Sequence, residues 1–380
     1  MSEASSATGE GAGSLKVAFL FISMPVGGAE DFLLSASRYL PPGIEPHFVC
    51  LRSLGVLGEE ARKAGCRVDL VPVFPTKRIN PLGIFHLARW FRENEIKVIH
   101  AQSYHDQLFG VIAARLAGIR SIVHQQKTFL KLKGRKGFFI RHIYRWADHV
   151  IALSEETRRD LIAAFELNPK EVSVVPNAID PAIFQPTADR DGVRASLSLS
   201  SEEFLVGSVA SLHHTKNHRA TVCALALLDQ KGVPLPKFML FGEGEDRPLL
   251  ERLIAENHLE GRLILAGRKR PVAPWLQSLD LFVLASDWEG QPLALLQALD
   301  CRVPILASRI EGNVALLSPD HPGLFDPQDA VGYAELLRRA TADGAFRDSL
   351  LMFQERLPRP SLPLLSNQLA ALYTRLASTL

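Results

Sequence analysis

Two residues in the second half of the chain stand out as able to do chemistry, because each follows a short apolar run. Glu289 follows "LFVLAS" (281–286), and Lys216 follows "FLVGSVA" (204–210), each just ahead of a helical pattern. Strands that alternate with helices bring such residues to one edge of a parallel sheet, where helix N-termini expose N–H groups. An ammonium and free N–H groups suit diphosphate oxygens. The pattern is that of a sugar-nucleotide site, although Lys216 also fits a solvated loop.

The segment after Glu289 contains a short helix that would face the same ligand. We expect Pro292 at its first helical position, which tolerates proline, and an amide-rich start at 291–293 that suits phosphate oxygens. Gln297 lies about two turns along this otherwise apolar helix. A polar side chain there needs a partner, which is either a ligand or neighbouring backbone.

Three histidines surround Lys216, at positions 213, 214 and 218. His213 and His214 are adjacent, and no carboxylate or cysteine completes a set of ligands, so we expect no metal here. The one "DRD" sequence (189–191) falls in a stretch interpreted as a surface connection. No metal site is therefore predicted.

The other loops that follow apolar runs are less specific. Gly27 and Gly28 lead into a helix without the G-x-G-x-x-G spacing, and fit either an anion site or a steric need for glycine. The loops that contain Gly242 and the run 267–270 either line a nucleotide pocket or connect elements at the surface.

These residues need a framework, and the sequence predicts two parallel sheets. Apolar, β-branched runs alternate with helical patterns such as 82–94, 106–117 and 155–165, and the alternation restarts near 204. Such alternation is typical of open α/β sheets, and 380 residues suit two domains. Ligands bind outside the carboxyl ends of such strands, so we expect the site in a cleft between two facing domains.

The domain boundaries follow from the same pattern. We expect a flexible tail at 1–15, an N-terminal domain at 16–182 and a C-terminal domain at 183–360. A helix at 361–380 is predicted to close the N-terminal domain. The Pro-, Asp- and Ser-rich stretch 180–203 is interpreted as the connection between the domains.

Composition excludes several classes of protein. A net charge of +2 gives no basic field to attract nucleic acid. The four cysteines have no C-x-x-C spacing and are interpreted as buried small hydrophobes in a reducing compartment. The N-terminal sequence lacks a signal-peptide pattern, and no stretch is apolar enough to span a bilayer. We expect a cytoplasmic protein, at most peripheral to the inner face of a membrane.

Five motifs in order resemble those of the retaining glycosyltransferases of family GT4, which have the GT-B fold of two facing Rossmann-like domains. The similarity covers nearly the whole chain. The motifs are "VGGAE" (26–30), "VPNAID" (175–180), "VASLHHTKNH" (209–218), "FGEGEDRPLL" (241–250) and "SLDLFVLASDWEGQPLALLQA" (278–298).

The resemblance implies transfer from a nucleotide-diphosphate sugar, held by the C-terminal domain, to an acceptor held by the N-terminal domain. It implies no cofactor and no metal, and catalytic roles for Glu289, Lys216 and His124. The residues it implies for the donor are Gly28, Ser211, Gly242, Gly267, Arg268, Gly290, Gln291, Pro292, Leu293 and Gln297. Those expected to contact the acceptor are Gly27, Lys127 and Lys131.

Three positions depart from the family pattern. Ser211 stands where the family has an arginine on the diphosphate, and Gln297 replaces the second glutamate of E-x7-E. The family's N-terminal histidine corresponds to His124 or to Gln126, depending on register. A glutamine still accepts from a ribose hydroxyl at a cost of about 1 kcal/mol, whereas loss of the arginine costs about 2–4 kcal/mol.

The stretch 127–149 combines seven cations with five aromatic residues. It suits an anionic membrane surface or a phosphorylated lipid-linked acceptor, or it is a solvated helix whose apolar side packs on the domain.

Three functions stay open at this point. The chain is an active glycosyltransferase of cell-surface polysaccharide or glycolipid synthesis, a non-catalytic GT-B protein that binds a sugar nucleotide or partner, or another GT-B enzyme such as a sugar-phosphate synthase. For the first, Glu289→Ala is expected to abolish transfer and leave folding intact.

Overall fold

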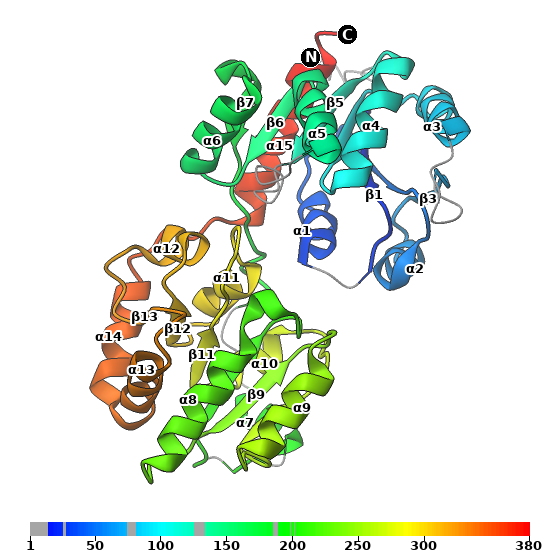
Figure 1. The fold of residues 1–380 in the computed structure, drawn as a ribbon. Helices are drawn as coiled ribbons and strands as arrows, with labels where there is room; N and C mark the ends of the chain where they lie inside the picture. The colour runs from blue at the N-terminus through cyan, green and yellow to red at the C-terminus, as the bar shows by residue number, and fades with distance from the viewer. Residues whose placement is uncertain are drawn as a thin grey trace, which may run out of the picture. The chain divides into compact units, whose positions relative to one another are not determined.

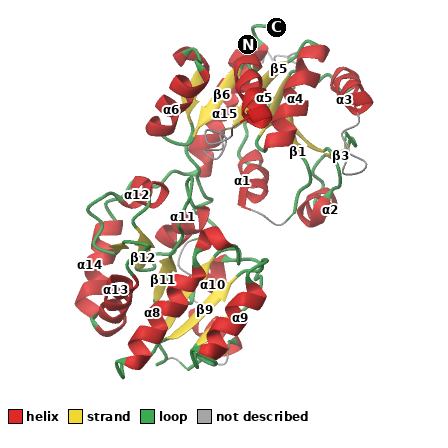
Figure 2. Cartoon of the chain, in the orientation of Figure 1, coloured by secondary structure: helices red, strands yellow, loops and turns green. Residues whose placement is uncertain are grey.

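The computed structural model describes residues 14–25, 28–73, 81–124, 134–184, 189–197, 199–200 and 202–380. The chain divides into two compact units (Figures 1 and 2). The first unit comprises Met1–Asn177 and Leu362–Leu380, and the second comprises Ala178–Ser361.

The first unit contains a seven-stranded parallel sheet in the order β3-β2-β1-β4-β5-β6-β7. Its strands are β1 (Leu15–Phe21), β2 (Ile44–Cys50), β3 (Val68–Leu70), β4 (Val98–Ala101), β5 (Arg120–His124), β6 (His149–Ala152) and β7 (Val172–Val174). Each strand lies within one of the apolar runs of the sequence or overlaps it, so the predicted alternation is confirmed for this half.

Helices flank this sheet, and the last of them comes from the far end of the chain. They are α1 (Gly28–Ser37), α2 (Gly55–Lys63), α3 (Pro81–Glu93), α4 (Tyr104–Ala117), α5 (Gly134–Trp146), α6 (Glu155–Phe165) and α15 (Leu362–Ala377), with a 3₁₀ turn η2 (Pro169–Glu171). In α15, the Ser366 hydroxyl donates to the Ala36 carbonyl at 2.7 Å, and Tyr373 is fully buried. The C-terminal helix thus belongs to the core of the first unit.

The second unit repeats the design with a six-stranded parallel sheet in the order β10-β9-β8-β11-β12-β13. Its strands are β8 (Leu205–Val209), β9 (Lys237–Phe241), β10 (Leu263–Leu265), β11 (Leu281–Leu284), β12 (Ile305–Ser308) and β13 (Leu324–Phe325). The last, a strand of two residues, was not predicted because so short a run carries no pattern.

The helices of the second unit complete its α/β layers. They are α7 (Arg190–Ser196), α8 (His218–Gln230), α9 (Arg247–Glu256), α10 (Ala273–Gln277), α11 (Leu293–Asp300), α12 (Glu311–Leu317), α13 (Ala330–Ala342) and α14 (Gly344–Gln354), with a 3₁₀ turn η3 (His214–Lys216) before α8. Buried side chains of sheet and helices form two apolar clusters in this unit. The predicted class, two parallel-sheet α/β domains, is confirmed.

The interpretation of 180–203 as a connection is wrong for the residues described. Phe184 and Leu199 lie in the apolar core of the second unit. Arg194, which is almost fully buried, donates to the Ser278 carbonyl at 3.0 Å and contacts Asp280 at 3.1 Å. The polar composition that suggested a linker belongs in part to a short helix, α7. Its Arg194 binds this helix to the rest of the second unit.

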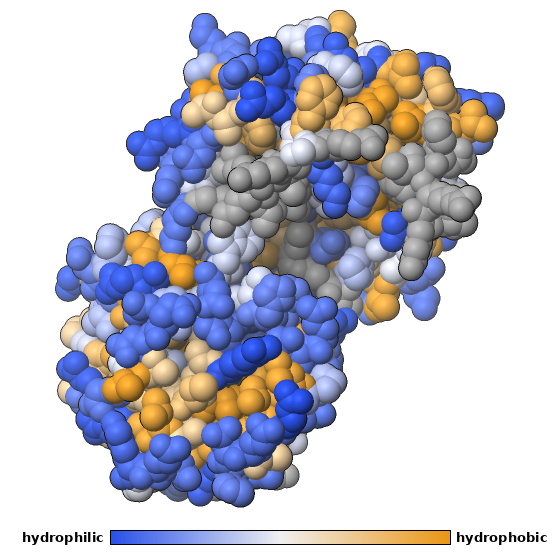
Figure 3. All heavy atoms as spheres, in the orientation of Figure 1, coloured by the Kyte–Doolittle hydropathy of each residue, from blue (hydrophilic) through white to orange (hydrophobic). Residues whose placement is uncertain are grey.

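Surface features correct one prediction about the cysteines. Cys50 and Cys301 are buried as expected, but Cys66 is half-buried and Cys223 is exposed. Polar and apolar residues are mixed over the visible face of each unit, as is usual for globular domains (Figure 3). Within the described part of the chain, no helix is both long and apolar enough to cross a bilayer.

Candidate active site

The first candidate site lies where the strand order of the second sheet reverses, between β8 and β11. Lys216 follows β8 and Glu289 follows β11, and the Lys216 ammonium lies 2.6 Å from Glu289 Oε1. The Ser286 hydroxyl donates to the same oxygen at 2.7 Å. Ligands of open α/β sheets bind at such a reversal of strand order. The structure thus brings together the two residues that the sequence singled out.

Residues of β12 and α12 hold the Glu289 turn in place. The Ser308 hydroxyl donates to the Ser286 carbonyl at 2.5 Å, and the Asn313 amide donates to the Ser308 carbonyl at 2.9 Å. A Cβ at Gly312 would lie 2.5 Å from the Glu289 carbonyl oxygen, so only glycine permits this close approach. The backbone of the Glu289 turn is therefore held by buried hydrogen bonds and by a close packing contact.

The Lys216 loop is tied to the same turn. The Asp287 N–H donates to the Thr215 carbonyl at 2.9 Å, and the Asn217 amide donates to the Asp287 carboxylate at 2.8 Å. Asn217 adopts the left-handed conformation, with φ of 48°, between η3 and α8. Asparagine tolerates this conformation better than most residues, so the loop geometry follows from the sequence.

The helix after Glu289 differs in two details from the prediction. Pro292 is the residue before α11, not its first residue, and the helix starts at Leu293. Gln297 is consequently the fifth residue of α11, a little more than one turn from its start rather than two. Gln297 is half-buried. In the described part of the chain no side chain or backbone group hydrogen-bonds its amide, so that amide is available to a ligand.

The remaining predicted donor residues lie on neighbouring loops of the second unit. Ser211, Arg268 and Gly290 are exposed, whereas Gln291 and Leu293 are half-buried. Gly242 is buried, and a Cβ there would lie 1.9 Å from the Ala210 carbonyl oxygen. Gly267 has a φ of +71°, a conformation that favours glycine. These glycines are required by the backbone itself, whatever else they contact.

The premise that no carboxylate accompanies the histidines near Lys216 is wrong. Glu245, after β9, lies 3.3 Å from His213 Nε2 and 3.7 Å from His214 Nδ1. His218 is not part of this group: it is buried, and its Nε2 lies 3.1 Å from the Ser211 carbonyl. His213 is half-buried, whereas His214 and Glu245 are exposed, and the ligand atoms of the three lie close enough together to hold a metal ion.

The expectation that Glu289 contributes little to folding needs correction. Only 9% of the residue is exposed, and it accepts hydrogen bonds from Lys216 and Ser286. Hydrogen bonds to a charged group contribute about 1.5–3 kcal/mol. Glu289→Ala would therefore lower stability as well as remove the carboxylate.

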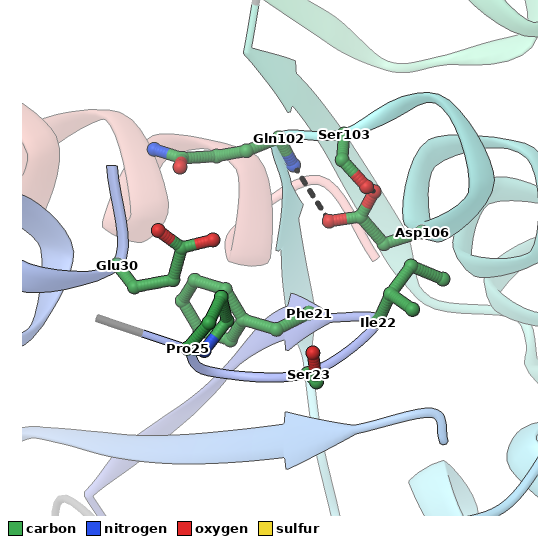
Figure 4. A pocket seen from close by; sticks show the side chains of 8 residues that line it. All are labelled: Phe21, Ile22, Ser23, Pro25, Glu30, Gln102, Ser103 and Asp106. Carbon is green, nitrogen blue, oxygen red and sulfur yellow. Dashed lines mark hydrogen bonds between the residues drawn. The ribbon is translucent and has the colours of Figure 1, made fainter. Parts of the chain in front are cut away.

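A second candidate site occupies the equivalent place in the first unit, where its strand order reverses between β1 and β4. A cavity of about 220 Å³ opens there (Figure 4). Its lining comes from the end of β1 and the loop after it, from α1, from the β4–α4 connection and from the first turn of α4. The lining residues are Phe21, Ile22, Ser23, Pro25, Glu30, Gln102, Ser103 and Asp106.

Asp106 is the centre of a group of hydrogen bonds in the lining of this cavity. It is buried, accepts from the Gln102 N–H at 3.3 Å, and accepts a short hydrogen bond from the Ser103 hydroxyl. Burial raises the pKa of the Asp106 carboxyl to about 7, while these hydrogen bonds act in the opposite direction. Burial also raises the pKa of Glu30. Both carboxyls thus lie in surroundings that disfavour their charged forms.

His124, the catalytic histidine suggested by the resemblance, is the last residue of β5 and is buried. Its Nδ1 lies 3.4 Å from His100 Nε2 and 3.5 Å from the Gln102 amide nitrogen. Tyr373 from α15 lies 2.8 Å from the other nitrogen of His100. Burial lowers the pKa of His124 to about 4, so the imidazole is neutral at pH 7.

Several predicted residues are not placed. Gly27, Gln126, Lys127 and Lys131 lie outside the described residues, and so does the choice between His124 and Gln126 as the family histidine. Gly28 is the first residue of α1, so the predicted helix is present and begins at the second glycine of the pair.

Sequence reasoning missed the supporting polar residues of both sites. In the second unit these are Ser286, Ser308 and Asn313; in the first they are Gln102, Ser103 and Asp106. A signal was present, since "AQSYHDQ" (101–107) places a polar run directly after an apolar strand, just as "SDWEGQ" (286–291) does. Serines and amides in loops are common, so the run alone does not identify a site.

The fold of the two parallel-sheet units is the GT-B fold, and comparison with a solved structure agrees. HepE of Anabaena, solved in complex with UDP and glucose, aligns with a TM-score of 0.80 over 95% of this chain and 99% of that chain, at 18% identity.

Family models and relatives identify the class more closely. The model described as Glycosyltransferase Family 4 matches residues 26–183, and that described as Glycosyl transferases group 1 matches residues 203–343. The chain belongs to the family 4 glycosyltransferases, as the motifs indicated.

Two relatives illustrate the similarity to proteins of known name. The UDP-Gal:alpha-D-GlcNAc-diphosphoundecaprenol alpha-1,3-galactosyltransferase of Escherichia coli is 28% identical over 68% of this chain and 70% of its own length. The N-acetylgalactosamine-N,N'-diacetylbacillosaminyl-diphospho-undecaprenol 4-alpha-N-acetylgalactosaminyltransferase of Campylobacter jejuni is 26% identical over 54% of this chain and 53% of its own length.

Proposed function

We propose that the protein transfers a sugar from a nucleotide-diphosphate sugar to a glycan or lipid-linked acceptor, with retention of configuration and without a metal. The observation that carries the proposal is the 2.6 Å pair of Lys216 and Glu289 at the strand reversal of the second unit. The names of the two relatives, which act on diphosphoundecaprenol-linked sugars, support an acceptor of that kind.

In this proposal the ion pair opens when the donor binds. The diphosphate replaces Glu289 as the partner of Lys216. The freed carboxylate then accepts hydrogen bonds from hydroxyl groups of the donor sugar. The ammonium then stabilises the leaving diphosphate as charge develops on it. The free N–H groups at the start of α11 and the Gln297 amide complete the donor contacts.

A thermal-shift titration with UDP, GDP, ADP and their sugar conjugates, without added metal, tests the donor. A ligand that binds only the folded state raises the melting temperature. A shift with one nucleotide supports the proposal and shows that Ser211 and Gln297 are tolerated. The absence of any shift would favour a non-catalytic protein. Release of free nucleotide with and without acceptor lipid then distinguishes glycosyl transfer from other GT-B activities.

We also propose that the protein contacts a membrane surface through α5. Phe138, Phe139 and Trp146 are 60%, 46% and 44% exposed, whereas the opposite side of the helix is buried in the core. Arg141 and Arg145 lie 3.7 and 2.8 Å from Glu166, which offsets part of the positive charge. The exposed aromatic residues, more than the net charge, therefore favour contact with a lipid surface.

Sedimentation with vesicles containing anionic phospholipid tests this contact. The double change Phe138→Ser and Phe139→Ser should lower the bound fraction several-fold, because two apolar anchors are removed. Met352→Ser is a matched control, since Met352 is 59% exposed on the second unit. Equal binding by both variants would refute the assignment to α5.

A further inference from the structure

Two histidines and a carboxylate lie together on two loops at the carboxyl edge of the second sheet. His213 and His214 follow β8, and Glu245 follows the neighbouring strand, β9. Glu245 Oε1 lies 3.3 Å from His213 Nε2 and 3.7 Å from His214 Nδ1. The ligand atoms of all three residues lie within 4.8 Å of one another. Three protein ligands that converge in this way are the set found in zinc sites with an open fourth position.

The spacing of these atoms fits a single ion. Zn²⁺ binds nitrogen and oxygen ligands at roughly 2.0–2.2 Å, which puts the ligand atoms of a tetrahedral site about 3.3–3.5 Å apart. The two separations from Glu245 need little change to reach these values. The imidazole rings of His213 and His214 have centroids 4.0 Å apart. Two protonated rings at that distance would repel each other, whereas one shared ion satisfies both rings and the carboxylate.

The backbone beside the three residues is fixed by contacts between the two loops. The Leu212 N–H donates to the Glu243 carbonyl at 3.1 Å, and the Asp246 N–H donates to the Leu212 carbonyl at 3.0 Å. A Cβ at Gly244 would lie 2.2 Å from the Leu212 carbonyl oxygen, so only glycine lets the loops approach so closely. The residues that flank the site are thus held in place before an ion binds, which lowers the entropy lost on binding.

His213 makes the additional contact that is typical of metal-binding histidines. Its Nδ1 lies 3.0 Å from the Thr215 hydroxyl, and its Nε2 faces Glu245. A ligating histidine almost always hydrogen-bonds through its other ring nitrogen, because that bond fixes the tautomer and the orientation of the ring. The Lys216 N–H donates to the His213 carbonyl at 2.8 Å and closes the turn that contains both histidines.

The donor atoms determine which ions suit the site. Two imidazole nitrogens and one carboxylate oxygen are ligands of Zn²⁺ and of related transition metals such as Co²⁺ and Ni²⁺. Mg²⁺ and Ca²⁺ prefer sets of oxygen ligands. Because His214 and Glu245 are exposed, an ion can reach the site from solvent and keep a water molecule as its fourth ligand.

We propose that His213, His214 and Glu245 bind one divalent transition-metal ion of the Zn²⁺ class, which joins the loop after β8 to the loop after β9. The ion is distinct from the metal-independent transfer proposed above, in which the Lys216 ammonium faces the diphosphate. Its effect is on the loop that contains Lys216, because an ion bound to both histidines fastens the 3₁₀ turn η3 to Glu245.

Titration of the untagged full chain with Co²⁺ and with Zn²⁺, after removal of metal by a chelator, tests the site. Four-coordinate Co²⁺ absorbs visible light more strongly than the hydrated ion does, so its spectrum reports the coordination geometry. Zn²⁺ is then added to displace it, and Mg²⁺ is the ion that should not compete.

Two variants remove ligands and two serve as controls. His213→Asn keeps a side-chain acceptor for the Thr215 N–H, and Glu245→Gln removes only a charge from an exposed residue. His258→Asn is the matched control, since His258 is an exposed histidine of the same unit whose φ of 55° asparagine tolerates. Cys223→Ser tests whether the exposed thiol of Cys223 binds the ion instead.

We expect the native chain to bind one equivalent of Co²⁺ with the spectrum of a four-coordinate site, and Zn²⁺ to displace it. Both ligand variants should bind about tenfold or more weakly, since even the loss of an outer partner of a ligand costs about 10–100-fold. The controls should bind like the native chain. Zn²⁺ should raise the melting temperature of the native chain and the controls, and not that of the ligand variants.

The proposal is overturned if the native chain binds no equivalent of ion, if both ligand variants bind like the native chain, if Cys223→Ser abolishes binding, or if Mg²⁺ displaces Co²⁺. Melting curves recorded without metal identify any variant that fails to fold.

Nucleotide release by the chelated chain separates this proposal from the proposed function. Transfer that persists without metal agrees with an ion that acts only on the loop. Transfer that is lost on chelation and restored by Zn²⁺ in the native chain, but not in Glu245→Gln, would support the site and refute metal-independent transfer.

Discussion

The candidate sites of the two units lie at the same point of the same topology, but their residues differ in charge. In the second unit a charged pair, Lys216 and Glu289, lies at the reversal of strand order. In the first unit the equivalent place is formed by a glutamine, a serine and carboxyls whose pKa values are raised by burial. The fold thus supplies a location, and the loops decide which ligand suits it.

The difference also concerns rigidity. Around the charged pair, glycines without room for a Cβ lock the loops, as at Gly242 and Gly312. The first-unit cavity is instead held by buried hydrogen bonds among polar side chains. The backbone of one site is thus fixed by the absence of side chains, and that of the other by buried hydrogen bonds.

Removal of the charge at Glu289 should have the largest effect. Glu289→Gln keeps the size of the side chain but loses the charge that faces Lys216, and we expect glycosyl transfer to fall by about 10²-fold or more. Nucleotide release in the presence of acceptor lipid is the measurement. If the Glu289→Gln enzyme stayed active, the charged pair would not be needed for transfer. The difference in charge between the two candidate sites would then have no bearing on function.

A smaller effect is expected from the loop glycines. Gly242→Ala forces a Cβ against the Ala210 carbonyl, and we expect a loss of about 1–3 kcal/mol in the free energy of unfolding, with weaker nucleotide binding. Gly344→Ala is the control, because its Cβ meets only the end of the Arg347 side chain at 3.6 Å. Denaturant titrations that show equal stability for both variants would contradict the locked loop.

The smallest expected effect concerns the stability of the first unit at acidic pH. Burial lowers the pKa of His124 to about 4, from an ordinary value of about 6.5. Between these values the unfolded chain binds the proton and the folded chain does not, so stability falls as the pH falls. From pH 7.5 to 5.5 we expect His124 to account for a loss of about 1 kcal/mol, which His124→Asn should remove.

Asp106 should act in the opposite direction. Its pKa is raised to about 7, so the folded chain holds the proton where the unfolded chain releases it, and its contribution grows as the pH falls from 7 towards 4. Between pH 7.5 and 5.5, the free energy of unfolding of Asp106→Asn should therefore fall by about 1–2 kcal/mol more than that of the native chain. Denaturant titrations at pH 7.5 and 5.5 measure how steeply the free energy of unfolding of each variant changes with pH. Equal slopes for the two variants would refute this account.

Sequence alone predicted the framework well because the alternation of apolar runs and helices is a repeated, local signal. It located Glu289 and Lys216 because each follows such a run. It did not predict their direct contact, which depends on the pairing of β8 with β11 across 73 positions of sequence. Glu245 beside His213 and Tyr373 beside His100 were missed for the same reason, since tertiary folding alone brings these residues together.

The strand of two residues, β13, and the short helix α7 show a second limit. Both are too short for a periodic pattern, and α7 has a polar composition that is typical of linkers. What fixes α7 is one buried arginine, Arg194, with partners about 80 residues away. Propensity and composition carry no information about such a contact.

The placement of α15 has a consequence for how the chain folds as it is synthesised. Residues 178–361 form a continuous segment that can fold as soon as it leaves the ribosome. The first unit begins earlier but waits for residues 362–380, which supply Tyr373 to His100 and Ser366 to Ala36. The part made first is therefore completed last, so we expect some of its apolar surface to stay uncovered until residues 362–380 are made.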